Sequence, residues 1–138
     1  MATTNASITI SSDITTNPIT ISKSMVMHKF QSNVGLEETT GLRTKKFAAT
    51  TAVVVVEQDE FTSTKASKVY MRNTGTSSEN FFYVAKHASA AASDTDGETI
   101  GKLYGGDWLL IPYLADVNIT VAPSTTGAMT LEYIVFAE

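Results

Sequence analysis

The chain has 138 residues, of which 43% are hydrophobic and 17% are charged, with a net charge of −4 at pH 7. This composition is not that of a disordered chain, and the absence of cysteine excludes disulfides, thiolate metal sites and cysteine nucleophiles. Without a basic cluster, a membrane-length apolar run of about 20 residues or a signal-peptide pattern, we expect one globular domain with no nucleic-acid and no membrane partner.

The N-terminal segment "SITISSDITTNPITIS" (residues 7–22) alternates isoleucine with small hydroxyl residues. This period predicts half-buried strands at residues 8–11 and 19–29, although each buries little surface by itself. Two hypotheses follow: an extended arm that pairs with the sheet of a neighbouring subunit, or a hairpin in the domain's own sheet that turns at Asn17 and Pro18. The candidate partner-binding residues of the arm are Ile8, Ile10, Ile14, Ile19, Ile21, Met25 and Met27.

Short strand patterns separated by turn formers continue to the C-terminus. We expect strands at residues 47–57, 68–73, 80–85, 99–103, 108–112, 117–121 and 129–136. The alanine-rich segment "HASAAAS" (residues 87–93) is too short for a stable helix and is interpreted as a loop. The pattern predicts an all-β fold, either an antiparallel β-sandwich or a jelly-roll-like arrangement. Residues 1–45 are expected to form the N-terminal arm and a linker that can partly join the sheet, and residues 46–138 the β-sandwich domain.

Three of the expected strands are apolar on both faces for most of their length: "AVVVVE" (52–57), "WLLIP" (108–112) and "LEYIVFA" (131–137). A strand of this kind either lies inside a two-layer core or is covered by a neighbouring subunit. Both alternatives stay open at this point, and a homo-oligomer is expected among the partners.

The segment "LYGGDWLLIPY" (residues 103–113) combines a tight turn with the single tryptophan. Gly105 and Gly106 can take positive φ, Asp107 can accept backbone N–H bonds, and Trp108 is then expected to anchor the next strand in the core. In the alternative interpretation, Trp108 forms an exposed aromatic platform for a sugar ring with Tyr104 or Tyr113.

The sequence contains few candidate residues for catalysis or metal binding, and none has the full set of ligands or partners that a site would need. "SDTDGE" places Asp94, Asp96 and Glu98 at alternate positions, but it lacks the further ligands of a calcium loop and is interpreted as an acidic surface turn. His28 and His87 have no second ligand at metal spacing, which a cupin-like enzyme would need. We therefore expect no enzyme, no cofactor and no metal.

The succession of "KVYMRNTG", "FFYVAK", "IGKLYGGDWLLIPY" and "VNITVAPSTTGAMTLEYIVFAE" resembles small β-sandwich virion proteins of tailed bacteriophages. The resemblance covers the second half of the chain and rests on strand order and turn chemistry. It implies a non-enzymatic structural protein of the virion, assembled in the host cytoplasm, with major capsid or other virion proteins as partners. A capsid decoration or cement protein that stabilises the shell at subunit junctions is the leading expectation. A neck- or tail-associated protein and a carbohydrate-binding or adhesive module are the alternatives.

Overall fold

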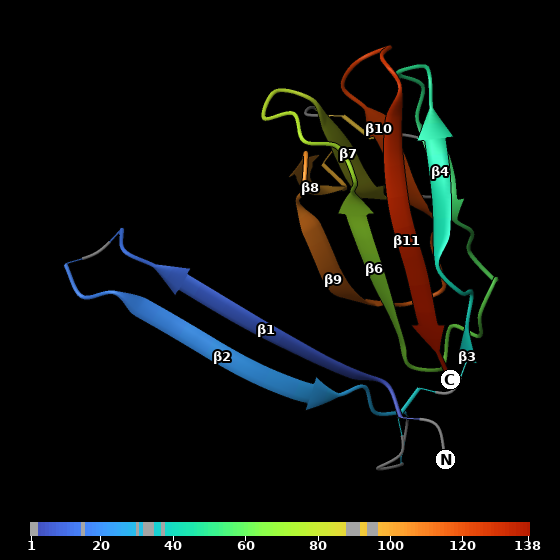
Figure 1. Cartoon of the computed structure of the whole chain (residues 1–138). Helices are drawn as coiled ribbons and strands as arrows, with labels where there is room; N and C mark the ends of the chain where they lie inside the picture. Colours follow the sequence, from blue (N-terminus) through green and yellow to red (C-terminus); the bar gives the residue numbers. More distant parts are fainter. Residues whose placement is uncertain are drawn as a thin grey trace.

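The computed structural model describes residues 3–14, 16–29, 31, 35–36, 38–87, 92–93 and 97–138. They form a projecting N-terminal hairpin and a two-sheet sandwich (Figure 1). The strands are β1 (Asn5–Ser12), β2 (Ile19–Val26), β3 (Glu38–Thr39), β4 (Arg43–Phe47), β5 (Val53–Val56), β6 (Ser67–Asn73), β7 (Phe81–Lys86), β8 (Thr99–Tyr104), β9 (Trp108–Tyr113), β10 (Ile119–Pro123) and β11 (Met129–Ala137). Within these ranges, no helix is long and apolar enough to cross a membrane.

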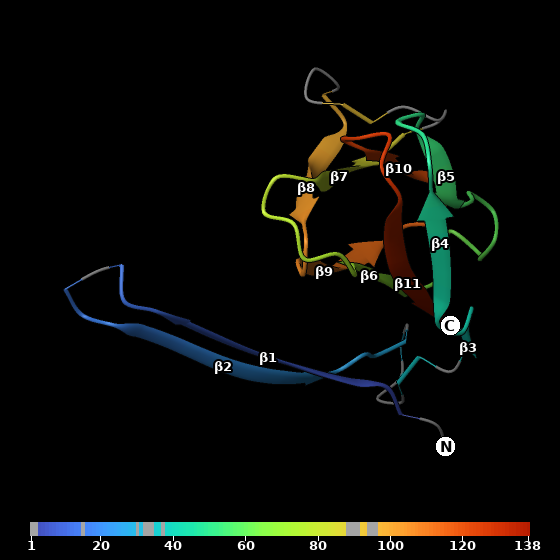
Figure 2. The same ribbon diagram turned by 45° about the horizontal axis from the view of Figure 1, so that its top comes forward.

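The sandwich has the strand order of a jelly roll. One sheet runs β4-β11-β6-β9, with β3 beside the end of β11, and the other runs β5-β10-β7-β8. All of these neighbours are antiparallel. The two sheets lie face to face (Figure 2), and the chain changes sheet at every connection from β4 to β11 except the β7–β8 hairpin. Eight strands in two such sheets make a jelly roll, so the predicted all-β antiparallel fold is confirmed.

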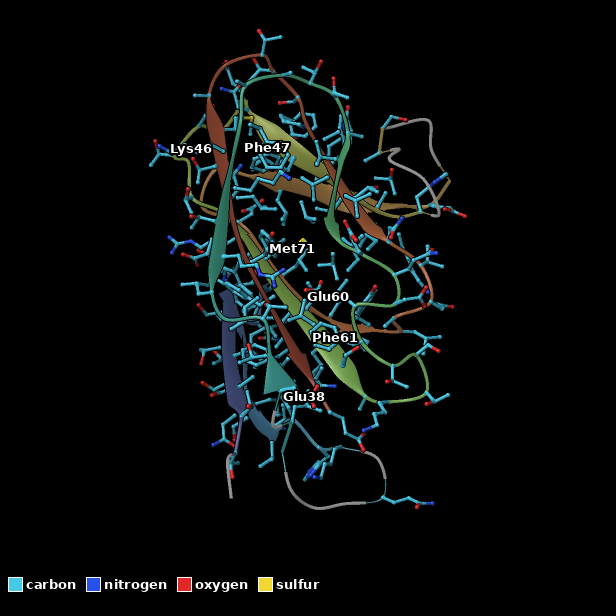
Figure 3. The ribbon with its side chains drawn as sticks, turned by 90° about the vertical axis from the view of Figure 1, so that its right-hand side faces the viewer. Glu38, Lys46, Phe47, Glu60, Phe61 and Met71 are labelled. Carbon is cyan, nitrogen blue, oxygen red and sulfur yellow. The ribbon has the colours of Figure 1, made fainter. Side chains whose placement is uncertain are left out.

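The core lies between the two sheets because alternate residues of the central strands face inward. On β11 every second residue, from Met129 to Ala137, is buried. Met71 and Phe82 are fully buried on β6 and β7, and the ring centroids of Phe47 and Phe82 lie 5.2 Å apart. Figure 3 shows Phe47 and Met71 between the sheets.

The single strand expected at residues 47–57 is wrong. Two strands, β4 and β5, lie there in different sheets, and residues 48–52 carry the chain from one sheet to the other. β4 begins at Arg43, so the boundary expected at residue 46 falls inside a strand of the sandwich. Its polar sequence "RTKKF" fits an edge position, where Arg43 forms a 3.1 Å ion pair with Glu60. Residues 88–91, in the segment interpreted as a loop, lie outside the described residues.

The predicted turn chemistry before β9 is confirmed for two of its three residues. Gly106 has a φ of +88°, and the Asp107 carboxylate accepts a 2.9 Å hydrogen bond from the Tyr104 backbone N–H. Gly105 does not have the expected positive φ, and glycine is needed there for another reason. A Cβ at this position would lie 2.5 Å from the backbone nitrogen of Ser77, so only glycine permits this close approach.

Buried Asn73 links the two sheets. Its side-chain N–H donates a 3.0 Å hydrogen bond to the carbonyl of Leu103 on β8, and its side-chain oxygen accepts one from the Gly75 N–H. We expect Asn73→Ala to lower the free energy of unfolding by about 2 kcal/mol, because the Leu103 carbonyl would lose this hydrogen bond in a dry environment. Urea unfolding measures the loss. The control Thr74→Ala removes an exposed hydrogen bond and should cost well under 1 kcal/mol; equal losses would contradict the prediction.

Candidate interaction surface

The N-terminal hairpin is a two-stranded sheet of its own. β1 pairs with β2 in a register that sets Ile10 opposite Ile21 and Ile8 opposite Lys23. Directly opposite residues share a face of a sheet, and so do residues two apart on one strand. One face of the hairpin therefore carries the apolar side chains of Ala6, Ile8, Ile10, Ile19, Ile21 and Met25. The other face carries mainly serine and threonine.

No layer of the described chain covers this apolar face. Ile10, Ile19, Ile21 and Met25 are each between 44% and 49% exposed. The hairpin extends away from the sandwich in both ribbon views (Figures 1 and 2). An isolated two-stranded hairpin is at best marginally stable in water, so this face is a candidate binding surface. We call it the hairpin face.

The structure brings together five of the seven candidate partner-binding residues. Ile8, Ile10, Ile19, Ile21 and Met25 share the hairpin face, as the alternating pattern implies. The hairpin exists, as one hypothesis held, but it is separate from the domain's own sheets.

The other two candidates lie elsewhere. Ile14 lies in the turn of the hairpin and is 91% exposed. Met27 is buried within the chain and is only 2% exposed.

Met27 belongs to the base that holds the hairpin. Its N–H donates a 2.9 Å hydrogen bond to the Thr4 carbonyl, and its carbonyl accepts a 2.7 Å bond from the Leu36 N–H. The Thr4 hydroxyl donates to the Leu36 carbonyl, and both Met27 and Leu36 are buried. Gly35 packs so closely that an added Cβ would lie 2.9 Å from the Thr4 nitrogen. These contacts fix the two ends of the hairpin next to each other.

A cleft of about 670 Å³ lies between the hairpin base and the outer face of the β11-β6-β9 sheet. The sheet contributes Tyr70, Trp108, Leu110, Ile134 and Phe136, and the hairpin side contributes residues that include Ala6 and Met27. We call these five sheet residues, with the neighbouring Leu42, the sheet cleft. The charged Arg72 also lines the cleft. The apolar hairpin face thus continues into a mainly apolar surface of the sandwich.

The expectation that Trp108 anchors the core is wrong, since its side chain is 49% exposed. In the sheet, Trp108 lies opposite Arg72 and Leu110 lies opposite Tyr70, all on the outer face. The inward residues of β9 are Leu109, Ile111 and Tyr113. Because "WLLIP" is apolar at both sets of alternate positions, its pattern could not show which set faces inward.

Charged residues, among them Lys68, Arg72 and Glu132, lie among the apolar ones on the outer face. Glu132 is opposite Arg72 in the sheet, and it accepts a 3.3 Å hydrogen bond from the Tyr70 hydroxyl. Burial, and then the adjacent Glu132 carboxylate, raise the pKa of Tyr70 above its ordinary value. Tyr70 therefore stays neutral at physiological pH and donates this hydrogen bond.

The sugar-binding platform of Tyr104, Trp108 and Tyr113 is not assembled on one face. Tyr113 is buried, and Tyr104 lies on the outer face of the other sheet, where its ring centroid is 5.0 Å from that of Phe81. Phe81 also contacts Tyr83, and the Lys102 ammonium lies 4.7 Å from the Phe81 ring centroid. The sheet cleft that Trp108 lines also contains the aromatic residues Tyr70 and Phe136.

Buried Tyr113 gives the fold a dependence on alkaline pH. Its hydroxyl donates a 2.9 Å hydrogen bond to the Val117 carbonyl. Burial raises the pKa of Tyr113 to about 12, and the carboxylates of Asp116 and Glu60 add to the shift. The unfolded chain releases this proton near pH 10, so the stabilisation is complete below about pH 10 and is lost as pH rises towards about 12.

We therefore expect the melting temperature to fall between about pH 9 and about pH 11. Tyr113→Phe should melt lower at neutral pH, because it lacks the hydrogen bond to Val117, but it should lose less on going to alkaline pH. Scanning calorimetry of both proteins at the two pH values checks the prediction. If the melting temperatures of both proteins fell by the same amount, the loss of stability at alkaline pH would not come from Tyr113.

The acidic turn and the histidines form no metal site in the described residues. Asp94 and Asp96 lie outside the described part of the chain, whereas Glu98 lies 3.6 Å from His87. His28 forms a backbone bridge with Gly35 at the hairpin base. Among the residues whose positions are described, no group of three His, Cys, Asp or Glu side chains could hold a metal ion.

Comparison with known proteins adds little to this geometry. No family model matches the sequence, and no curated protein matches it. Among solved structures, the chain is similar to the crystal structure of Aeromonas hydrophila PliG, a periplasmic lysozyme inhibitor of g-type lysozyme. The two are 14% identical, the alignment covers 71% of this chain and 85% of that chain, and the TM-score is 0.36. A likeness at this level does not indicate a shared function.

Proposed function

We propose that the protein is a non-enzymatic structural subunit of a bacteriophage virion, acting as a capsid decoration or cement protein that stabilises the shell at subunit junctions. The observation that carries the proposal is the projecting hairpin with its uncovered apolar face. Exposed, contiguous apolar surface is typical of protein–protein contact sites. The hairpin reaches a neighbouring subunit, while the sandwich lies on or between the shell subunits.

The fold and the sequence resemblance also support a function as a structural protein of the virion. Jelly rolls build viral capsid domains, although they also build lectins and cupins, so the fold admits a shell protein without requiring one. The turn before β9 and the order of the last strands are those for which the sequence resembles phage virion proteins. In a particle, many copies repeat one contact, and avidity makes a modest contact effective.

The proposal is tested on particles purified from the culture in which the protein is made. Antibodies raised against the chain should label intact virions, and mass spectrometry should find the protein in the purified particles. Labelling over the whole shell indicates a capsid protein, and labelling at one vertex indicates a neck or tail protein. Recovery of the protein only in the particle-free fraction would overturn the virion assignment.

A second candidate is a carbohydrate-binding or adhesive module, favoured by the exposure of Trp108 beside Tyr70 in the sheet cleft. Sugar rings stack on such aromatic faces through their apolar C–H groups. Because Trp108 is the single tryptophan, its fluorescence reports on this site directly. A shift of emission on titration with glycans supports the module, and unchanged emission across a glycan panel excludes it.

A further inference from the structure

The hairpin face and the sheet cleft are two apolar surfaces of one chain that meet only at the hairpin base, where Ala6 lines the cleft, and do not cover each other beyond it. The hairpin base is held by the hydrogen bonds among Thr4, Met27 and Leu36, and from there the hairpin extends away from the sandwich. Ile10 and Ile21 consequently remain nearly half exposed, and so does Trp108 on the sheet. Each surface therefore needs a cover from outside its own chain.

We infer that the sheet cleft of one chain receives the hairpin face of a second copy. In the smallest closed arrangement two copies exchange hairpins reciprocally, and the same contact closes a ring of three or more. This inference deepens the proposed function, on which it rests for the particle setting, because it names the neighbour that the hairpin reaches.

The receiving sheet is as long as the hairpin. Eight residues of an antiparallel strand span about 27 Å, which is the length of β1 and β2. The nine-residue β11, which borders the sheet cleft, is about 30 Å long by the same rise. Two sheets pack about 10 Å apart when apolar side chains interdigitate, so the isoleucines of the hairpin can lie between Tyr70, Leu110 and Ile134.

A reciprocal exchange lowers the area that each contact needs. Interfaces of standard size bury about 1,600 Å² in total. In a reciprocal exchange this area comes from two equivalent contacts, so each contact has to bury only about 800 Å², counting both sides. Each contact joins the five large side chains of the hairpin face to the aromatic and aliphatic side chains of the sheet cleft.

Charge complementarity supports the pairing. Lys23 is the one charged residue that the register places on the hairpin face. Glu132 lies on the outer face of the receiving sheet, beside Tyr70. Arg72 is opposite Glu132 on β6, Lys68 lies on the same outer face, and Thr44 is opposite Glu132 on β4, so the docked hairpin must place Lys23 on the Thr44 side of Glu132. A polar pair of this kind sets the register of an otherwise apolar contact.

The first experiment measures mass by light scattering, with purified full-length protein from about 1 to 100 μM. We expect a dimer or a small closed ring. Ile10→Asp/Ile21→Asp should weaken self-association at least 100-fold. The matched control Thr9→Asp/Ser22→Asp adds the same charges to an opposed pair on the other face and should associate like the wild type. A monomeric wild type, or equal effects of the two double substitutions, would overturn the inference.

The second experiment asks which surfaces meet. Leu110→Asp impairs the sheet cleft and Ile10→Asp/Ile21→Asp impairs the hairpin face, so each variant alone should be monomeric. Their mixture should form a complex through the one intact pair of surfaces. Circular dichroism first verifies that both variants are folded. A mixture that stays monomeric, when both variants are folded, contradicts the pairing of these two surfaces.

A charge exchange provides a test that does not introduce charge into an apolar contact. Lys23→Glu and Glu132→Lys should each weaken association about 10-fold, and the protein carrying both should recover it. The emission of Trp108 should shift to the blue as the oligomer forms. A blue emission that persists in the monomer would mean that the chain's own hairpin closes the cleft, which overturns the inference. These readouts need no virus particles, so they separate this inference from the proposed function.

Discussion

Replacing residues 5–26 with two glycines should leave the sandwich folded and abolish its association. The replacement joins Thr4 to Met27, whose backbones already form a 2.9 Å hydrogen bond, so a tight glycine turn can connect them. The free energy of unfolding should change by less than about 1 kcal/mol, because β1 and β2 pair only with each other. Calorimetry measures the stability, and light scattering measures the association.

The loss of association should be complete, because the replacement removes all five large side chains of the hairpin face. The control is the full-length protein with Thr9→Asp/Ser22→Asp, which keeps the hairpin face intact. If the shortened chain failed to fold, the hairpin would be part of the sandwich's stability. If it folded and still associated, or still bound to particles, the hairpin would not be the binding element.

Phe82→Ala should lower the free energy of unfolding by about 3–5 kcal/mol, which is a large part of the stability of a domain of this size. Phe82 has no exposed surface and lies between the sheets against Phe47, with ring centroids 5.2 Å apart. Its truncation removes apolar contacts and leaves a cavity that β7, hydrogen-bonded on both sides, cannot collapse to fill.

Phe81→Ala is the matched control, since it removes the same ring from the next position on β7. Phe81 is half-buried on the outer face, where it contacts Tyr83, Tyr104 and Lys102. The Phe81→Ala substitution should lower the free energy of unfolding by about 1–2 kcal/mol. Denaturant unfolding of the two variants gives the comparison. Equal losses of stability would show that Phe82 and Phe81 do not lie on the inner and outer faces of the sheet as described.

Strands with one buried and one solvent-exposed face could be predicted from the sequence. "KVYMRNTG" alternates Val69 and Met71 with longer polar or amphipathic residues, and the structure places both of them in the core. The turn at Gly106 and Asp107 was also predictable, because a positive φ and a side-chain acceptor are local requirements. Local chemistry decides such features, and little else competes with it.

Strands that are apolar at every position could not be assigned in the same way. On β9 either Trp108 and Leu110 or Leu109 and Ile111 could face the core, and the expectation that Trp108 faces it is wrong. The register with β6 decides the facing. The polar β4 was missed for a related reason, because a strand at the edge of a sheet tolerates charge that a central strand does not.

The candidate site was only partly predictable. The alternating isoleucines indicated the hairpin face, but Met27 fitted the same pattern and is buried at the base. The sheet cleft was missed as a surface, since Tyr70, Trp108, Ile134 and Phe136 come from three separate strands. The sequences "WLLIP" and "LEYIVFA" do indicate this surface. Only one of the two sets of apolar positions on each strand can face the core, so the other set lies on the outer face.

The sequence by itself determined the all-β class, the turns and the alternation that gives the hairpin one apolar face, because these depend on residues close together in the chain. The tertiary structure alone decided the jelly-roll strand order, the outward facing of Trp108 and the separation of the hairpin from the sandwich sheets. These features arise from pairing between distant strands. Such pairing depends on the total area buried by the whole fold, and short segments of sequence do not contain that information.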